Sequence, residues 1–317
     1  MKRMMLAGVM VMLGGLSVRA GAQMDDPKFV PREEPVVEAP VEEVKAVPLT
    51  ALLRVDDEFA YRAESVVRQR VTTPAGVALE SVNESDAEFV FRVVAVTDAG
   101  AEVEMRYARL RVSVTGSGAA VGGMEFDSDE SREDEEGNLL AMSLRPIVEG
   151  VMTVVLDAQM EVREVRGLAG LIPEGGKSLI TEESIISTVT PVFALRGEPG
   201  EARVGEAWTS EGSEKQRSVV LKRTSTKKLE RVSGGEATLS MTDETKVESG
   251  SMGGGMELEV WKTTGTAVWD AKERRLVSIR ADAEQVFKGS QAGVPIRQSQ
   301  TIESKMTRIP VEKGEDK

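Results

Sequence analysis

Long runs of alternating apolar and polar residues constrain the fold of this chain more than any other feature. From about Thr50 onward the alternation has a period of two, which is typical of half-buried β-strands and not of helices. In the run that starts near Phe59, one side carries Arg62, Glu64, Arg68 and Arg70. The other side carries Phe59, Tyr61, Ala63, Ser65, Val67, Gln69 and Val71.

The following segments extend this pattern into a β-hairpin. Residues 89–97 are apolar on both sides apart from Arg92, so we expect a strand buried in the centre of a sheet. Residues 98–100 then predict a turn. After Tyr107 the apolar residues move to the opposite parity, which predicts a bulge or sharp bend near Ala108.

The second half of the chain repeats this order of elements. Residues 204–208 open it much as residues 55–61 open the first half, and Gly234 with Gly235 predicts a hairpin turn. Each half then passes a glycine-rich stretch, and each closes on a turn led by an aspartate, Asp157 or Asp270. The glycine-rich stretches are residues 116–123 and 250–255. We therefore predict a mainly β fold with two related antiparallel β-sheet subdomains in tandem, residues 50–170 and 201–310; one large irregular sheet is the alternative.

Helical patterns are rare. The segment 139–148 predicts a short helix with Asn138 as its N-cap. Within the predicted short helical connector, residues 171–200, the segment 178–189 shows helical spacing of its apolar residues, and Pro191 is expected to stop that helix.

The N-terminus has the pattern of an export signal. Lys2 and Arg3 precede an apolar run, residues 4–16, and small residues at 20–22 form a cleavage site, so residues 1–22 are predicted to be a signal peptide. The apolar run is shorter than the roughly 20 residues that a helix needs to cross a bilayer. We expect a secreted protein, periplasmic or extracellular, with no transmembrane segment after signal cleavage.

Residues 23–49 are rich in proline and glutamate and predict a disordered linker, because proline interrupts helices and central strands and the carboxylates repel one another. Residues 311–317 are likewise predicted to be a disordered tail. The chain is acidic overall, with a formal charge of −13, which argues against nucleic acid as a partner.

The chain contains no histidine and no cysteine. This composition excludes histidine-dependent and cysteine-dependent nucleophilic catalysis, disulfides, and zinc or haem sites of the usual kinds. We predict no catalytic residues, no cofactor-binding residues, no metal ligands and no cofactor.

Two motifs resemble known catalytic or nucleotide-binding patterns without matching them. Gly170 followed by residues 176–178 resembles a phosphate-binding loop, but Leu171 stands where that loop needs glycine. Residues 225–228 have the form SxxK, and residues 262–265 resemble the KTG element of serine β-lactamases. Ser225 lies in a strand-like run, whereas that chemistry needs the serine at a helix N-terminus, so polar strand faces explain both elements better.

Two further groups of residues have the chemistry of ligand-binding side chains. The acidic run 125–136 offers oxygens at alternate positions, among them Asp127 and Asp129, yet it lacks the turn glycine and the closing glutamate of a calcium loop. A solvated acidic loop is the simpler interpretation. The three tryptophans all lie in strand patterns, where packing is expected of them rather than sugar binding. They are Trp208, Trp261 and Trp269.

Through most of residues 52–309 the chain resembles an uncharacterised family of exported bacterial proteins of unknown function, best known from planctomycete-type organisms. The resemblance rests on Tyr61 in the first strand and on residues 126–128, 162–168 and 204–208. It implies export and a mainly β fold, and it implies no activity, substrate or catalytic residue.

These observations lead to one functional prediction with two alternatives. We expect an exported, non-catalytic binding or structural protein of the cell envelope, not an enzyme, with an unknown envelope protein or an apolar ligand as its partner. The first alternative is a carrier of a lipid or other apolar ligand in a curved β-sheet cavity. The second is an unidentified hydrolase.

Overall fold

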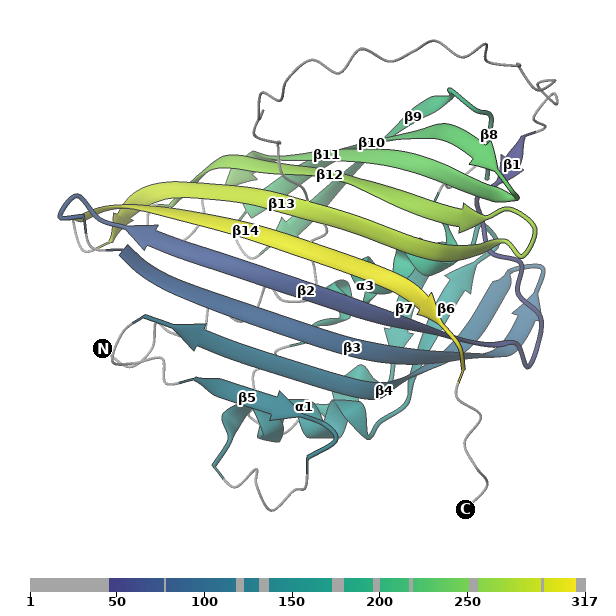
Figure 1. Cartoon of the computed structure of the whole chain (residues 1–317), viewed down its shortest axis with the longest axis horizontal. Helices are drawn as coiled ribbons and strands as arrows, with labels where there is room; N and C mark the ends of the chain where they lie inside the picture. Colours follow the sequence, from purple (N-terminus) through teal and green to yellow (C-terminus); the bar gives the residue numbers. More distant parts are fainter. Residues whose placement is uncertain are drawn as a thin grey trace, which may run out of the picture.

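A computed structural model of the chain describes residues 46–311, apart from residues 77, 118–122, 131–136, 173–179, 196–199, 217–218, 251–255 and 292–293. Its main feature is one antiparallel 12-stranded sheet, which Figure 1 shows as a broad curved layer with helices on one side. The strand order is β7-β6-β4-β3-β2-β14-β13-β12-β11-β10-β9, and β5 also pairs with β4. The prediction of a mainly β fold is confirmed.

The strands of the first half are β2 (Glu58–Thr72), β3 (Ala78–Thr97), β4 (Gly100–Gly116), β5 (Met124–Asp127), β6 (Met152–Asp157) and β7 (Val162–Arg166). Those of the second half are β9 (Ala207–Gln216), β10 (Val219–Ser233), β11 (Glu236–Gly250), β12 (Glu257–Asp270), β13 (Arg275–Gln291) and β14 (Val294–Ile309). A separate two-stranded sheet is formed by β1 (Val47–Pro48) and β8 (Glu201–Ala202).

The two predicted subdomains share this sheet instead of having one each. Strand β14 pairs with β2 along thirteen residue pairs, from Arg297 opposite Thr72 to Ile309 opposite Ala60. The prediction of tandem subdomains at 50–170 and 201–310 is corrected to two halves of one sheet, in line with the alternative of one large sheet. The physical reason is that β2 and β14 would each be an open edge in a separate subdomain, and their pairing removes both edges.

Local turn and bulge predictions agree with the structure. The register between β3 and β4 shifts between Glu88 and Phe89, which face Arg109 and Tyr107, so Ala108 is the extra residue of a bulge. Gly234 and Gly235 form the β10–β11 turn with φ values of +61° and +89°, which a side chain would disfavour. The Oδ1 atom of Asp157 accepts hydrogen bonds from the backbone N–H groups of Gln159 and Glu161.

The predicted helix at 139–148 is confirmed as α1 (Leu139–Val148). The side chain of Asn138 caps it by accepting hydrogen bonds from the N–H groups of Leu140 and Ala141 at 2.9 and 3.2 Å. A four-residue helix, α2 (Leu168–Leu171), follows β7. None of the helices in the described part of the chain is both long and apolar enough to cross a membrane.

The second predicted helix exists with different limits. Helix α3 (Glu182–Phe193) begins at the N-cap Thr181 and continues through Pro191, so the prediction that Pro191 stops it is wrong. Proline removes one N–H and clashes with the preceding turn, but Pro191 lies two residues before the helix end, where little helix remains to be disrupted. Residues 178 and 179 of the predicted helix lie outside the described residues.

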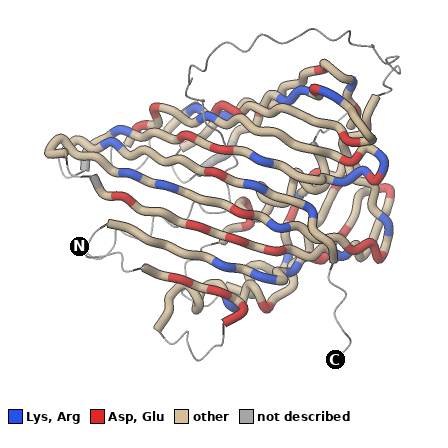
Figure 2. The backbone as a smooth tube through the Cα atoms, viewed as in Figure 1, with Lys and Arg blue, Asp and Glu red and all other residues tan. Residues whose placement is uncertain are grey.

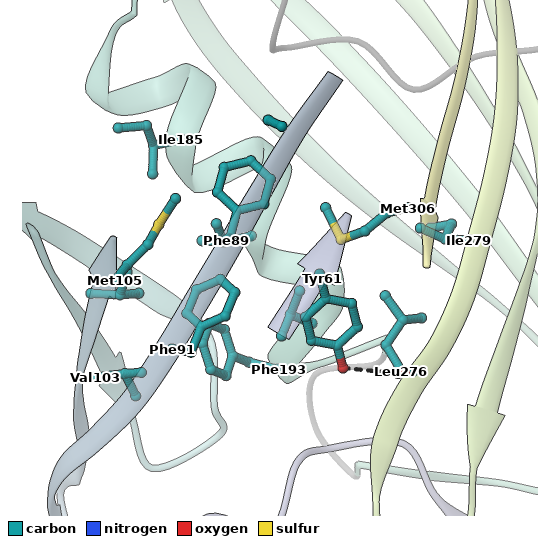
Figure 3. Close-up of a cluster of buried hydrophobic side chains, with 14 of the residues drawn as sticks. Tyr61, Phe89, Phe91, Val103, Met105, Ile185, Phe193, Leu276, Ile279 and Met306 are labelled. Atoms are coloured by element: carbon teal, nitrogen blue, oxygen red, sulfur yellow. Dashed lines mark hydrogen bonds between the residues drawn. The ribbon is translucent and has the colours of Figure 1, made fainter. Parts of the chain in front are cut away.

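The main core lies between α3 and the aromatic part of the sheet (Figure 3). Phe193 of α3 makes edge contacts with Phe59 and Phe91, with ring centroids 6.2 and 5.7 Å apart. Phe59 and Phe91 are themselves stacked at 5.3 Å across β2 and β3. Each of these rings is buried, and burying a phenylalanine contributes about 2 kcal/mol, so this cluster fixes α3 on the sheet.

The sheet curves around this core. Helix α3 contacts both β7, at one end of the strand order, and β13, beyond the middle of it. In addition, the carboxylate of Glu161, beside β7, acts electrostatically on the ammonium of Lys227 on β10. The two ends of the sheet therefore approach each other on the side that carries α3.

The boundary of the predicted N-terminal linker needs correction. Val47 and Pro48 form β1 and pair with Ala202 and Glu201 of β8, so the end of the predicted linker 23–49 is structured. Leu49 is fully buried, and the indole of Trp269 donates a 2.9 Å hydrogen bond to the carbonyl of Pro48. The edge position of β1 accommodates the proline, which has no N–H to donate. The signal peptide 1–22, linker residues 23–45 and tail residues 312–317 lie outside the described residues.

Candidate ligand-binding face

The two faces of the sheet differ in charge. On the outer face, which points away from α3, oppositely charged residues pair across neighbouring strands, as with Arg68 and Glu303 at 2.8 Å and Arg70 and Glu80 at 3.5 Å. Figure 2 shows acidic and basic residues distributed over the strands of the sheet. Exposed pairs of this kind stabilise little, but they mark a face that is in contact with water.

The inner face is the face that packs against α3, and its residues are uncharged along β2 and β3. On β2 the inner positions are the alternate residues from Phe59 to Val71, and on β3 those from Leu79 to Val93. None of these positions holds a charged side chain. The part of the inner face around Phe59 and Phe91 belongs to the main core, which on β4 continues as far as Val114.

Toward the other end of β2 and β3, the strand register aligns inner-face residues into three rows that run across the sheet. The first, which we call the small row, contains Ser85, Ser65, Ser304, Ala281 and Gly265 on β3, β2, β14, β13 and β12. The second, the Asn83 row, contains Val114, Asn83, Val67, Ile302 and Ala283. The third, the glutamine row, contains Ser81, Gln69, Gln300, Gln285 and Trp261.

The Asn83 row has an apolar centre that is separate from the main core. Val67, Ala283 and Ile302 form a second hydrophobic cluster of their own, with exposed fractions of 2%, 3% and 1%. Beside them, Asn83 is 3% exposed, and its Oδ1 atom is buried without a hydrogen-bond partner. A buried amide oxygen without a partner costs roughly 1–3 kcal/mol, so this position is energetically unsatisfied.

The glutamine row adds uncharged polar groups next to this cluster. Gln285 and Gln300 face each other across β13 and β14, and both are buried, at 3% and 4% exposure. Gln69 continues the row on β2, and Trp261 ends it on β12. A row of buried amides is unusual in a filled apolar core, because each amide brings donors and acceptors that need partners.

Charged residues enter the inner face toward β10 and β11. The guanidinium of Arg223 forms an ion pair with the buried carboxylate of Asp243. Further along β10, the ammonium of Lys227 donates a 2.9 Å hydrogen bond to the carbonyl of Leu195. Burial lowers the pKa of Lys227, with Arg223 acting in the same direction and Asp243 opposing it. Both cations are therefore engaged by groups of the protein itself.

The near-matches to serine β-lactamase elements do not form a reactive pair. Ser225 and Lys228 are three residues apart on β10, and an odd spacing places them on opposite faces of the strand. The ammonium of Lys228 pairs with Glu230 at 2.6 Å, and Ser225 lies on the inner face opposite Asp243. The KTG-like residues 262–265 form part of β12, where only Thr263 and Gly265 share the inner face.

The acidic run 125–136 also has a structural role where it is described. Asp127 is 5% exposed and its carboxylate lies 3.4 Å from Arg109 and 3.2 Å from Arg111. Asp129 pairs with Arg109 at 3.1 Å. Residues 131–136 lie outside the described residues, and among those described no cluster of three or more acidic side chains has the geometry to hold a metal ion.

The glycine motif and the three tryptophans lie in separate parts of the fold. Of the phosphate-loop resemblance, Gly170 lies in α2 and residues 176–178 are not among the described residues. Trp269 is completely buried and bonded to Pro48, as expected for a packing residue, and Trp208 packs partly buried against the main core. Trp261 differs, because it ends the glutamine row on the inner face.

Sequence reasoning missed the rows themselves. The alternation on β2 already places Ser65, Val67 and Gln69 on one side of the strand. The missing information is the pairing with β14, whose Ile302 lies opposite Val67 although the two residues are 235 positions apart in the chain.

Comparisons with known proteins leave the family open. No family model matches the chain, and no curated protein matches it. Among solved structures, lipovitellin, from a study of lipid–protein interactions in that protein, is 8% identical with a TM-score of 0.43. That match covers 82% of this chain and 26% of the lipovitellin chain, so this chain spans about a quarter of it.

Two further solved structures show weaker likenesses. The translocator domain of the autotransporter NalP from Neisseria meningitidis is 6% identical with a TM-score of 0.26, covering 79% of this chain and 88% of that one. An outer membrane channel from Pseudomonas putida F1 is 12% identical with a TM-score of 0.20, and the match covers 84% of this chain and 100% of the channel. With TM-scores this low, these likenesses assign no function to this chain.

Proposed function

We propose that this protein is an exported, non-catalytic binding protein that holds an apolar or amphipathic ligand against the inner face of its sheet. The observation that carries the proposal is the contrast between the two faces of β2 and β3. Their outer positions carry ion pairs such as Arg68 with Glu303, whereas their inner positions beyond the core carry no charge. An uncharged sheet face of this length suits an apolar or amphipathic partner better than an ionic one.

The composition of the three rows supports a ligand rather than a catalytic role. Serine, glycine and alanine in the small row have little side-chain volume, so a molecule lying across them meets few protruding atoms. The Asn83 row next to it supplies aliphatic contacts through Val67 and Ile302. No nucleophile in these rows is paired with a base, since the inner positions of β2 and β3 hold neither acids nor lysines.

Export is part of the proposal and rests on the N-terminal sequence. Lys2 and Arg3, the apolar residues 4–16 and the small residues at 20–22 follow the order of a signal peptide. A carrier in the periplasm or outside the cell would meet lipids and other apolar molecules that need protection from water. A hydrolase remains without support in the described residues, because the SxxK-like Ser225 and Lys228 lie on opposite faces of β10.

A binding experiment with a neutral apolar fluorophore tests the proposal. N-phenyl-1-naphthylamine is titrated into the exported chain, purified without detergent, and the fluorescence gain on binding is measured. Replacing Ser65 in the small row by tryptophan fills the inner face and is expected to weaken binding at least tenfold. The matched control is Arg68→Trp, which introduces the same side chain on the outer face of the same strand and should leave binding unchanged.

Two results would count against the binding function. The first is no fluorescence gain with the wild-type chain together with a native mass spectrum that shows only the bare polypeptide; a filled structural scaffold would give this result. The second is equal binding by Ser65→Trp and Arg68→Trp when both variants keep the wild-type melting temperature, which would place any bound fluorophore elsewhere.

A further inference from the structure

We propose that the ligand on the inner face is an uncharged amphiphile whose head group carries a hydrogen-bond donor, a hydroxyl or an amide, as in a monoacylglycerol. This inference rests on the binding function proposed above and narrows the class of ligand. It is carried by the unpartnered amide oxygen of Asn83, the neutral glutamine row and the engagement of the nearby cations by the protein itself.

The side chain of Asn83 favours a ligand that carries a hydrogen-bond donor. Its Oδ1 atom is buried and lacks a hydrogen-bond partner, and the residue is 3% exposed at an inner-face position opposite Val67 and Val114. Only an N–H or O–H group can satisfy this acceptor. Hydroxyl and amide head groups carry such a group, whereas an ionised carboxylate or a phosphodiester offers acceptors only.

The glutamine row favours a neutral head group of the same kind. Gln69, Gln300 and Gln285 lie side by side on β2, β14 and β13, and each amide both donates and accepts. Two residues along a strand span about 7 Å, so the glutamine row lies about 7 Å from the Asn83 row, and one head group can contact both. A head group with several hydroxyls can therefore contact both rows while its acyl chain lies along Val67, Ile302 and the small row.

The two inner-face cations of β10, Arg223 and Lys227, are already engaged by groups of the protein and are not free for an anionic head group. Arg223 is neutralised by the buried carboxylate of Asp243. The ammonium of Lys227 donates a 2.9 Å hydrogen bond to the carbonyl of Leu195, and burial lowers its pKa. The chain as a whole carries a formal charge of −13, which repels anionic amphiphiles in solution as well.

The test compares three ligands with the same oleoyl chain, each measured by its displacement of N-phenyl-1-naphthylamine. Monooleoylglycerol is neutral and carries hydroxyl donors, methyl oleate is neutral without a donor, and oleate is anionic. We expect monooleoylglycerol to bind at least tenfold more tightly than either of the other two. Tighter or equal binding of oleate would overturn the neutral head group, and equal binding of methyl oleate would overturn the requirement for a donor.

The variant Asn83→Leu tests whether Asn83 accepts the hydrogen bond from the ligand's head group. Leucine has a similar size and no acceptor to leave unsatisfied, so we expect this variant to fold with an unchanged or higher melting temperature. Its preference for monooleoylglycerol over methyl oleate should fall to less than threefold. The control Glu84→Gln changes a neighbouring residue on the outer face and should keep the full preference.

The outcomes separate the two proposals. If none of the three ligands and no fluorophore binds, the binding function itself fails. If all bind without a preference, the function stands and the head-group inference is overturned. If Asn83→Leu retains the tenfold preference, the donor is recognised elsewhere and the role of Asn83 is refuted.

Discussion

The hydroxyl of Tyr61 on β2 donates a 2.8 Å hydrogen bond to the backbone carbonyl of Leu276 on β13. The two residues are 215 positions apart in the chain, and β14 lies between their strands. This bond therefore ties the first half of the chain to the second across an intervening strand. Its burial makes it worth more than a similar bond at the surface, because water cannot replace the lost partner.

Tyr61→Phe is expected to lower the free energy of unfolding by about 1–2 kcal/mol, since it leaves the Leu276 carbonyl with one partner fewer. Urea denaturation followed by circular dichroism measures the change. The control is Tyr107→Phe, another buried tyrosine of the inner face, whose pKa is raised by burial alone. An equal loss in both variants would show that the Leu276 bond adds nothing specific.

The alkaline limit of stability should be set by these two tyrosines. Burial raises the pKa of both Tyr61 and Tyr107 above the usual value near 10, and they are the only 2 tyrosines in the chain. The folded state therefore keeps both protons at a pH where the unfolded state releases them, so stability is lost as the pH rises above about 10. Each tyrosine contributes about 1.4 kcal/mol per pH unit in that range.

Parallel titrations of tyrosinate absorbance and far-ultraviolet circular dichroism test this expectation. The two signals should change together, because the tyrosines ionise only as the sheet unfolds. Tyrosinate that appears near pH 10 with the dichroism unchanged would show that the rings are accessible in the folded state.

Gly265 in the small row is predicted to tolerate no side chain. A Cβ atom there would lie 2.5 Å from the carbonyl oxygen of Arg280 and 2.9 Å from the Cβ of Ala281. Gly265→Ala should destabilise the protein by about 1–3 kcal/mol, because the atoms it would meet belong to the adjacent strand β13 and would have to shift. Gly212→Ala on the edge strand β9 meets nothing within 4 Å and should be neutral or slightly stabilising. Thermal melts of both variants make the comparison, and similar melting temperatures would contradict it.

Lys227→Met is expected to raise stability at pH 7 by up to about 1 kcal/mol, because it removes the cost of burying an ammonium near Arg223. A lysine whose folded pKa lies below its unfolded value binds fewer protons when folded. Wild-type stability therefore rises relative to the variant as the pH increases from the folded pKa toward the unfolded value.

Urea denaturation of wild type and Lys227→Met at pH 7, 8.5 and 9.5 measures this trend, below the range in which the tyrosines ionise. The advantage of the variant should shrink once the pH passes the folded pKa of Lys227 and should be smallest at pH 9.5. The nearby carboxylates of Asp243 and Glu161 favour the charged lysine and limit the size of the effect. A variant that is less stable at every pH would show that the bond to Leu195 outweighs the desolvation.

The sequence predicted most of what depends on neighbouring residues. The alternation near Phe59, the bulge at Ala108, the turn at Gly234 and the cap at Asn138 are all set within a few residues, and each is present in the structure. The end of α3 differs from the prediction because Pro191 lies in the last turn of the helix, where a proline disrupts little.

The pairing of β2 with β14, which joins the two halves, could not be predicted from neighbouring residues. Nothing in β2 or β14 alone specifies that Val67 lies opposite Ile302, because the pairing is decided by which open edges remain once each hairpin has formed. The candidate site depends on that pairing, since all three rows cross it. In the sequence its amides resemble ordinary polar strand residues, and only the register places them side by side.

The pairing of β2 with β14 also sets an order of events. During synthesis β2 finds β3 early, yet its other edge stays unpaired until the last long strand, residues 294–309, has been made. Until then both β2 and β13 present open edges that other chains can join. Formation of the native sheet therefore waits for the C-terminal strand, which makes this a slow-folding topology of high contact order.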